Sequence, residues 1–333
     1  MNGPAAAEVA VARGDAPLAV VAIGGNALII DEQHRSLADQ AMSVGTACPA
    51  LAALMASGWR VVVTHGNGPQ VGFILRRSEI AYPEVPVVPM DYATADTQGA
   101  IGSMFQRALH HELALRRLDR SAVTLVTHVA VDPADPAFAR PDKPIGPFYT
   151  EACARSLAHR FGWQVAEDSG RGWRRVVPSP RPLAILEAED IDHLSRQGRV
   201  VVACGGGGIP VLRGAEGTLT GVEAVIDKDR TSALLARLLS AQALLLCTGV
   251  EAVFTGWGKP TARRLGRIGE AEARALIASG ELGAGSMRPK VEAALDYLAG
   301  PAASPRRAII GRLDRLPDLI EGTSGTAIVA GPT

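Results

Sequence analysis

The stretch VVVTHGNGPQVG, residues 61–72, places three turn-forming residues between an apolar run and a proline. Residues 61–64 are typical of a buried strand, and the proline at position 69 can begin a helix. Gly66 and Gly68 let the backbone approach a ligand closely, and the free N–H groups at a helix start bind anions. The stretch predicts a strand that passes into a helix through a loop suited to an anionic ligand, although a tight turn alone would give the same pattern.

Short apolar runs alternate with longer helical patterns along the chain. The runs are near-continuous, as expected for strands that helices cover on both faces of a sheet. They occupy residues 18–24, 60–65, 122–128, 199–204, 243–249, 308–311 and 326–330. Helical patterns between them include residues 39–58 and 227–240. This alternation predicts an α/β fold with a mainly parallel sheet.

Three of the predicted strands end in glycine-rich sequence: AIGGN (22–26), THGNG (64–68) and ACGGGG (203–208). Ligands of open parallel sheets bind beyond the carboxyl ends of the strands, so we expect the three clusters to meet on one rim. The common phosphate-binding fingerprints are missing. The chain lacks G-x-x-x-x-G-K-[ST], and Val71 stands where G-x-G-x-x-G requires its last glycine. Phosphate must therefore be held in another way.

Two lysines stand near predicted helix starts. Lys228 lies in VIDKDRTSALL, and Lys290 lies in GSMRPKVEAALDYL. A cation in the first turn faces the positive end of the helix dipole, which costs a few tenths of a kcal/mol up to about 1 kcal/mol. A bound anion would reverse the sign of this contribution. A single lysine so placed is most simply a solvated one, but two favour a site for a phosphoryl group.

The composition indicates a globular chain with no overall charge. Of its 333 residues, 47% are hydrophobic, and 34 Lys and Arg residues balance 34 Asp and Glu residues. Net charge favours neither nucleic acid nor an acidic membrane surface as a partner.

No apolar run is long enough to span a membrane, and residues 1–17 lack the pattern of a signal peptide, so we expect a flexible tail and a cytoplasmic location. The cysteines, which have no CxxC spacing, are expected to be free thiols: Cys48, Cys153, Cys204 and Cys247.

Residues 132–182 interrupt the alternation. They are rich in Pro, Arg and Trp, as in DPADPAFARPDKPIGPFYT and GRGWRRVVPSPRP. We interpret them as a lid subdomain inserted into one main domain, which residues 18–131 and 183–333 form. Basic residues of the segment, among them Lys143 and Arg174, can bind phosphate, so we expect it to close over a labile substrate and exclude water. The alternative is a rigid surface insertion that does not move over a substrate and whose arginines only form surface ion pairs.

From Ala19 to about Val329 the sequence resembles the carbamate kinases of the amino acid kinase superfamily. The matching motifs are VVAIGGNAL, THGNGPQVG, TQGAIG, VDPADPAF, KPIGPF, GRGWRRVVPSP, CGGGGIPV, GVEAVIDKD, TGVEAVF and GSMRPK. The glycine motifs are shared across the superfamily, whereas acetylglutamate, aspartate and uridylate kinases are not expected to carry KPIGPF with GRGWRRVVPSP. The resemblance implies a three-layer αβα sandwich around a mostly parallel sheet of about eight strands, with a protruding subdomain and a homodimer.

The resemblance also implies a reaction, in which carbamoyl phosphate and MgADP give ATP and carbamate, which decays to ammonia and carbon dioxide. It assigns contact with the phosphoryl group to Lys228, Lys290 and Lys143, with Asp229 orienting the lysines. Substrate contacts would come from Gly24, Gly25, Asn26, Gly66, Asn67, Gly68 and Arg174. The nucleotide would lie near Thr248, Gly249, Val250, Trp257 and Lys228. Asp227 and Asp229 could touch Mg²⁺, but we expect the ion to arrive with the nucleotide and keep several waters, so no metal site within the protein is expected.

Other functions stay open on sequence grounds. The shared glycine loops permit a kinase for another small carboxylate, although the motifs of the insertion disfavour it. A catalytically silent nucleotide or metabolite sensor would be expected to lose a lysine, and all three are present. A dinucleotide dehydrogenase is disfavoured by the missing fingerprint. The source of carbamoyl phosphate is equally open, because catabolism of arginine, agmatine or a purine product could each supply it.

Two details qualify the resemblance. The family often carries an apolar or small residue where Asp96 stands, and Gly-Tyr where Gly102 and Ser103 stand. These departures bear on the contacts of the nearby loop. His65, which precedes the glycine loop, invites a catalytic role, but we interpret it as a residue that shapes the loop through a hydrogen bond.

Overall fold

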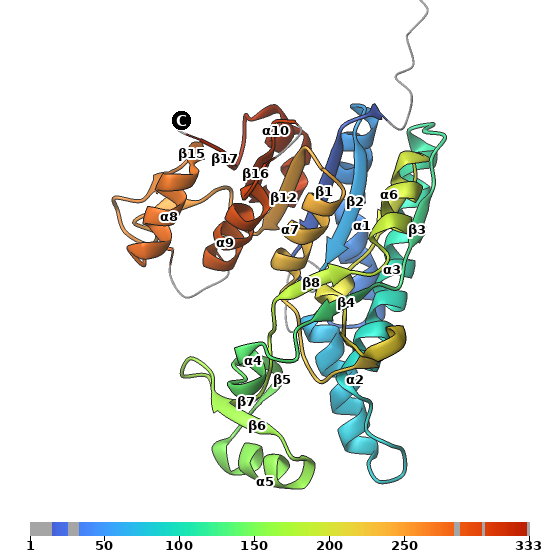
Figure 1. The fold of residues 1–333 in the computed structure, drawn as a ribbon, viewed down its shortest axis with the longest axis vertical. Helices are drawn as coiled ribbons and strands as arrows, with labels where there is room; N and C mark the ends of the chain where they lie inside the picture. Colours follow the sequence, from blue (N-terminus) through green and yellow to red (C-terminus); the bar gives the residue numbers. More distant parts are fainter. Residues whose placement is uncertain (1–14, 26–32, 283–286, 302–303, 332–333) are drawn as a thin grey trace, which may run out of the picture.

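A central sheet of eight strands organises the computed structural model, which describes residues 15–25, 33–282, 287–301 and 304–331 (Figure 1). The strands, in spatial order, are β15 (Arg267–Gly269), β17 (Thr326–Val329), β16 (Arg307–Arg312), β12 (Ala243–Thr248), β1 (Leu18–Ile23), β2 (Arg60–His65), β9 (Val200–Val202) and β3 (Ala122–Thr124). From β16 to β3 all neighbours are parallel, whereas β17 runs antiparallel to β16 and pairs in parallel with β15. The predicted α/β fold with a mostly parallel, eight-stranded sheet is confirmed.

Helices cover both faces of this sheet. They are α1 (Leu37–Ala56), α3 (Met90–Leu115), α6 (Ala188–Arg196), α7 (Lys228–Leu238), α8 (Glu270–Ala278), α9 (Met287–Leu298) and α10 (Leu316–Glu321). Helix α2 (Gly68–Ala81) instead extends beyond the sheet, and its buried Val71 and Leu75 pack in a separate cluster with Ile145 of the insertion. Alternate residues of β1 divide between two cores. Val20 packs among side chains of α6, α7, α8 and α9, and Val21 packs among those of α1, α3 and α10. Because each face is covered, every residue of β1 and β2 is buried, which explains the continuous apolar runs.

The apolar run at residues 122–128 is not one strand, contrary to expectation. It ends as β3 at Thr124, and a separate strand β4 (His128–Val131) follows. The break has a hydrogen-bonding cause: the Thr127 backbone N–H donates to Gln98 Oε1 at 2.8 Å, and its hydroxyl accepts from Cys204 N at 3.0 Å. These bonds turn the chain out of the central sheet. A second sheet of order β11-β10-β4-β8 results, with β11 (Leu219–Gly221), β10 (Ile209–Arg213) and β8 (Pro182–Ile185).

The segment between β4 and β8 projects from the central sheet on the side to which α2 also extends (Figure 1). It contains α4 (Pro136–Ala139), β5 (Lys143–Tyr149), α5 (Glu151–Phe161), β6 (Gln164–Glu167) and β7 (Trp173–Val177), with the antiparallel sheet order β5-β7-β6. It packs on α2: the Tyr149 hydroxyl donates to Glu79 at 3.3 Å, and the rings of Tyr82 and Phe161 lie 5.7 Å apart. Its behaviour as a separate lid stays a prediction.

The described part of the chain also contains a short hairpin, β13 (Phe254–Thr255) with β14 (Arg263–Arg264). None of the helices described is long and apolar enough to cross a membrane. The predicted tail falls mostly outside the described residues, which begin at position 15.

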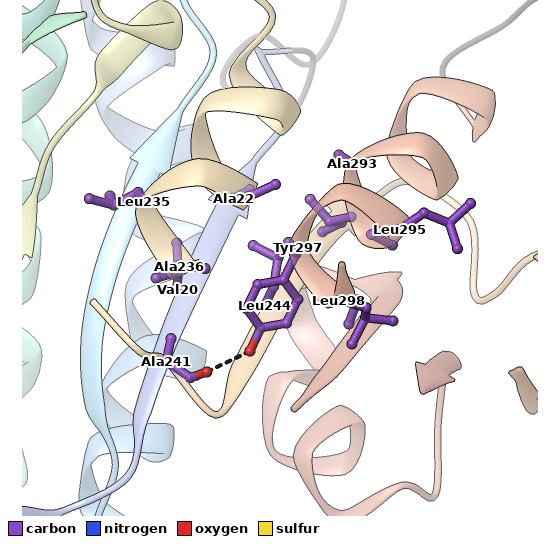
Figure 2. Close-up of a cluster of buried hydrophobic side chains, with 14 of the residues drawn as sticks. Val20, Ala22, Leu235, Ala236, Ala241, Leu244, Ala293, Leu295, Tyr297 and Leu298 are labelled. Carbon is purple, nitrogen blue, oxygen red and sulfur yellow. Dashed lines mark hydrogen bonds between the residues drawn. The ribbon is translucent and has the colours of Figure 1, made fainter. Parts of the chain in front are cut away.

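A tyrosine lies within the core between α7 and α9, where apolar side chains surround it (Figure 2). Tyr297 is fully buried, and its hydroxyl donates a 2.6 Å hydrogen bond to the Ala241 carbonyl. Burial raises the pKa of Tyr297, with Arg306 opposing the rise, so the group stays a neutral donor. The bond satisfies the carbonyl at the turn that leads from α7 into β12.

Replacing Tyr297 with Phe should lower the free energy of unfolding by about 1–3 kcal/mol, because the buried Ala241 carbonyl loses its donor. Chemical denaturation followed by circular dichroism measures the change. Tyr92→Phe on α3 is the matched control, since that side chain is exposed and its loss should cost under about 0.5 kcal/mol. Equal stability of the two variants would contradict this account of the core.

Candidate functional site

The three glycine clusters meet at the carboxyl ends of β1, β2 and β9, as the sequence predicts. The backbones touch: a Cβ added to Gly66 would lie 2.6 Å from Gly25 N, so only glycine fits there. Gly206, in the short 3₁₀ turn η3 (Gly205–Gly207), has a φ of 69°, and an added Cβ would lie 2.1 Å from the Asn67 side chain. These contacts require glycine for close approach and leave backbone N–H groups at the rim.

Two polar residues hold the loop after β2 in place. His65 is buried, its Nδ1 lies 3.0 Å from the Gly66 carbonyl, and its ring stacks on Phe105. Burial lowers the pKa of His65 to about 4, so the ring is neutral at pH 7. Asn67 precedes α2 and donates from its side-chain nitrogen to Thr97 Oγ1 at 2.8 Å. The interpretation of His65 as a loop-shaping residue is confirmed by its contacts.

A buried carboxylate joins two lysines from different helices. Lys228 is the first residue of α7, and its Nζ lies 2.5 Å from Asp229 Oδ1. Lys290, in the first turn of α9 and 4% exposed, places its Nζ 2.9 Å from Asp229 Oδ2. Asp229 itself is 5% exposed. Asp229 therefore already provides both lysines with an anionic partner, which the position of each lysine at a helix start does not reveal.

Asp229, Lys228 and Lys290 change one another's pKa values through their charges. Burial alone would raise the pKa of Asp229, but Lys228 and Lys290 outweigh it and hold the value at about 2. Burial also opposes the charge on Lys228, yet Asp229 raises the pKa of that lysine overall. The pKa of Lys290 is lowered by burial and then by the ammonium of Lys228. With both lysines charged, the cluster carries one surplus positive charge.

Lys143 reaches this region from the insertion. It is the first residue of β5, and its Nζ lies 3.1 Å from Asp227 Oδ2. Asp227 is the N-cap of α7 and accepts hydrogen bonds from the backbone N–H groups of Asp229 and Arg230. The sequence distance between Lys143 and Asp227 is 84 residues, so no local pattern reveals the contact.

A cavity of about 550 Å³ lies between the glycine loops and the lysine cluster. Its lining among the described residues is Gly24, Gly25, Gly66, Asn67, Gly68, Pro69, Lys143, Gly206, Val225, Ile226, Asp227, Lys228, Asp229, Cys247, Thr248, Gly249, Lys290 and Leu313. It thus brings together most of the residues that the sequence predicted, from both halves of the main sheet and from the insertion. The shape suits an elongated anionic ligand whose phosphate lies among the lysines.

Three predicted site residues that the structure describes do not line this cavity. Arg174 instead pairs with Asp168 at 3.0 Å and packs against the ring of Phe148. Val250 and Trp257 lie beyond the cavity lining, and the Trp257 side chain is largely exposed beside Phe254. Asn26 falls outside the described residues.

The sequence predicts Asp227 only as a possible contact of Mg²⁺ and does not reveal its pair with Lys143, although composition marks the lysine. Only four of the 34 basic residues are lysines, and three of those four line the cavity. Arginine supplies the positive charge almost everywhere else. A lysine kept in such a chain marks a position that needs a compact point charge, not a planar guanidinium.

The described His, Cys, Asp and Glu side chains do not gather into a metal-binding site. No group of three or more of these described side chains could hold a metal ion. The carboxylates that line the cavity, Asp227 and Asp229, are both engaged with lysines. This chemistry fits an ion that is coordinated by nucleotide phosphates and water more than one held by the protein.

The geometry defines a class of protein, an α/β protein whose parallel strands end at an anion site built from glycine loops and lysines. Residues 17–304 match the family model described as the amino acid kinase family. The chain belongs to the amino acid kinase family.

Within that family the chain is similar to carbamate kinases over nearly its whole length. It is 44% identical to the carbamate kinase-like protein YahI of Escherichia coli, with 94% of this chain and 98% of that protein covered. It is 42% identical to the carbamate kinase of Pyrococcus furiosus, with 93% and 98% covered. A carbamate kinase from Giardia lamblia bound to AMP-PNP has a TM-score of 0.88 and 37% identity, with 96% and 100% covered. The resemblance seen in the motifs is confirmed.

The departures from the family pattern lie away from the cavity. Asp96 and Ser103 are both exposed on α3. Gly102 is buried, and a Cβ there would lie 2.2 Å from Thr124 Cγ2. Helix α3 and β3 therefore pack closely at this point, and Asp96 and Ser103 lie on the exposed side of α3.

The neutral state of His65 predicts a pH dependence of stability. Because its pKa is about 4 in the folded state and near 6.5 when unfolded, the unfolded chain takes up a proton first as the pH falls. The contribution of neutral His65 to the free energy of unfolding is therefore complete above pH 6.5. As the pH falls toward 4, up to about 3 kcal/mol of that free energy is lost. Urea unfolding of the wild type and of His65→Asn across this range isolates the effect as a difference.

Exposed His110 on α3 provides the control for this comparison. His110→Asn should follow the wild-type profile from pH 7 to pH 4. A His65→Asn profile parallel to the wild type would contradict a buried neutral His65.

Proposed function

We propose that this protein catalyses reversible phosphoryl transfer between carbamoyl phosphate and MgADP, giving ATP and carbamate. The observation that carries the proposal is the convergence of Lys143, Lys228 and Lys290 on one cavity opposite the glycine loops. The relatives named carbamate kinase, which share about 42–44% of the sequence, support the choice of substrate. The Giardia lamblia enzyme bound to AMP-PNP supports the use of an adenine nucleotide.

The residues of the cavity supply what phosphoryl transfer needs, namely position and charge stabilisation. In the direction of ATP synthesis, a β-phosphate oxygen of ADP attacks phosphorus, the bond from phosphorus to the carbamate oxygen breaks, and carbamate leaves as an anion. No proton must move, which fits a cavity lined by lysines and backbone N–H groups. The lysines neutralise charge on the transferring group, and the N–H groups of Gly25 and Gly68 would face its oxygens, whereas the Gly66 N–H donates to the Ile23 carbonyl at 2.9 Å and fixes the loop.

The nucleotide is proposed to lie along the carboxyl end of β12, where Thr248 and Gly249 line the cavity. Val250 and Trp257 lie farther out, so in this proposal they would contact the adenosine part of the nucleotide. Mg²⁺ would neutralise phosphate charge and be held mainly by the nucleotide and water. Contact between Arg174 and substrate would require the insertion to move and the Asp168 pair to open. A homodimer and a cytoplasmic location complete the proposal.

A kinase for another small carboxylate is the second candidate. The glycine loops and the three lysines would serve such a substrate equally well. A silent sensor is less well supported, because the buried lysine pair on Asp229 is an arrangement that mere binding does not need.

A coupled assay of ATP formation should show turnover with ADP, Mg²⁺ and carbamoyl phosphate, and weaker turnover with acetyl phosphate. Hexokinase and glucose-6-phosphate dehydrogenase report the ATP formed. Strong activity with acetyl phosphate and none with carbamoyl phosphate would move the protein to the second candidate. Nucleotide binding without turnover on either donor would favour the sensor.

Lys290→Met should lower kcat by about 100- to 1,000-fold, because one preorganised positive group is lost from the transition state. The fold should persist, since Asp229 keeps Lys228 as its partner and methionine has a similar volume. Arg288→Met on the same helix is the matched control, because that side chain is exposed and pairs only with Glu292 among the described residues. Steady-state kinetics with thermal unfolding of each variant separates catalysis from stability. Full activity of Lys290→Met would remove this lysine from the mechanism.

A further inference from the structure

The loop that leads into α7 meets the insertion at three places. Asp227 pairs with Lys143, the Val225 backbone N–H donates to the Pro178 carbonyl at 2.9 Å, and Glu223 pairs with Arg175 at 2.6 Å. Residues 223–227 therefore form a seam along which the insertion joins the part of the chain that carries Lys228 and Asp229. The side chain at the cavity end of this seam is Asp227.

The two oxygens of the Asp227 carboxylate have different partners. Oδ1 accepts from the backbone N–H groups of Asp229 at 2.9 Å and Arg230 at 3.4 Å, and so caps the helix. Oδ2 accepts from Lys143 Nζ at 3.1 Å. One side chain thus fixes both the first turn of α7, where Lys228 and Asp229 lie, and the ammonium group of the insertion.

This division has an electrostatic consequence for the cavity. The ammonium groups of the three cavity lysines would repel one another. The carboxylates of Asp227 and Asp229 offset two of these three positive charges. Lys143 is the most exposed of the three, at 38% of its side chain, so it has the most freedom to swing into solvent. Burial would raise the pKa of Asp227, but Lys143 outweighs it, so the pKa lies below its usual value and Asp227 stays charged.

We propose that Asp227 is a positioning residue for Lys143, and that it acts as an internal counterion which the phosphoryl group of the substrate displaces. Before substrate binds, Asp227 holds the ammonium group at the edge of the cavity. A phosphoryl group carries more negative charge than one carboxylate, so Lys143 turns toward it while Oδ1 continues to cap α7. The proposal rests on the proposed function, because it takes a phosphoryl donor as the ligand.

Asp227→Asn separates the two uses of the carboxylate. Asparagine is as good an N-cap as aspartate, so α7 should be preserved, whereas the charge that holds Lys143 is lost. We expect kcat/KM for carbamoyl phosphate to fall at least about tenfold, the size of one charge-assisted hydrogen bond, with KM for ADP nearly unchanged. In a Lys143→Met background the same substitution should change kcat/KM by less than about twofold, because its target is gone.

A measurement without catalysis checks the position of Lys143 directly. The chain has only four lysines, so limited acetylation followed by peptide mass spectrometry can follow each one. Exposed Lys259 is the internal reference. Without substrate, Asp227→Asn should raise the labelling of Lys143 at least about threefold relative to Lys259, since the ion pair no longer protects the amine. Carbamoyl phosphate should lower that labelling in the wild type.

Asp135→Asn is the matched control. Asp135 caps α4 with Oδ1 and accepts from the Arg181 backbone N–H with Oδ2, so it has the same divided geometry without a lysine. This variant should keep wild-type kinetics and labelling. Additive kinetic effects of Asp227→Asn and Lys143→Met, with unchanged labelling of Lys143, would overturn the proposal and leave Asp227 as a helix cap. A different result would refute only the proposed function. In that case the acetylation of Lys143 depends on Asp227, but the protein has no activity with carbamoyl phosphate.

Discussion

Asp229 places one buried carboxylate between two lysine ammonium groups, and the arrangement of the whole site depends on this contact. Removing three charges from water costs several kcal/mol for each ion, and the cost is offset only if every oxygen and ammonium finds a close partner. The distances of 2.5 and 2.9 Å meet that condition. They are possible because α7 and α9 pack side by side on one face of the sheet and point their first turns at the same place. The sheet order, which puts β1, β12 and β16 together beneath these helices, is therefore a requirement of the site.

The surplus of one positive charge in this cluster explains how a chain of zero net charge binds an anion. The glycine loops face the cluster across the cavity and add backbone N–H groups, which carry partial positive charge without a side chain that would fill the space. Close contact between Gly66 and Gly25 keeps these groups fixed. A preorganised field of this kind needs no reorganisation during reaction, which is the condition for effective charge stabilisation.

Local patterns allowed the strands, the glycine rim and the two lysines at helix starts to be predicted from the sequence, because each depends on residues close in the chain. The contacts that complete the site join distant residues. Asp229 meets Lys290 across 61 residues, and Asp227 meets Lys143 across 84. The prediction of one strand at 122–128 was wrong for the same reason, since Gln98 on α3 and the backbone of Cys204 supply the hydrogen bonds that divide it. Arg174 was placed in the site by its charge, but its partner Asp168 lies within the insertion.

The choice of lysine over arginine at the site follows from its geometry. Each oxygen of Asp229 accepts one ammonium group in a space where Lys290 is only 4% exposed. A guanidinium would take both oxygens of one carboxylate in a planar fork and exclude the second helix from Asp229. A point charge on a flexible stem can instead share a carboxylate and still turn toward a phosphoryl oxygen. A chain that uses arginine for nearly all its other basic positions thus keeps lysine where one anion must be shared between two cations and then exchanged for another.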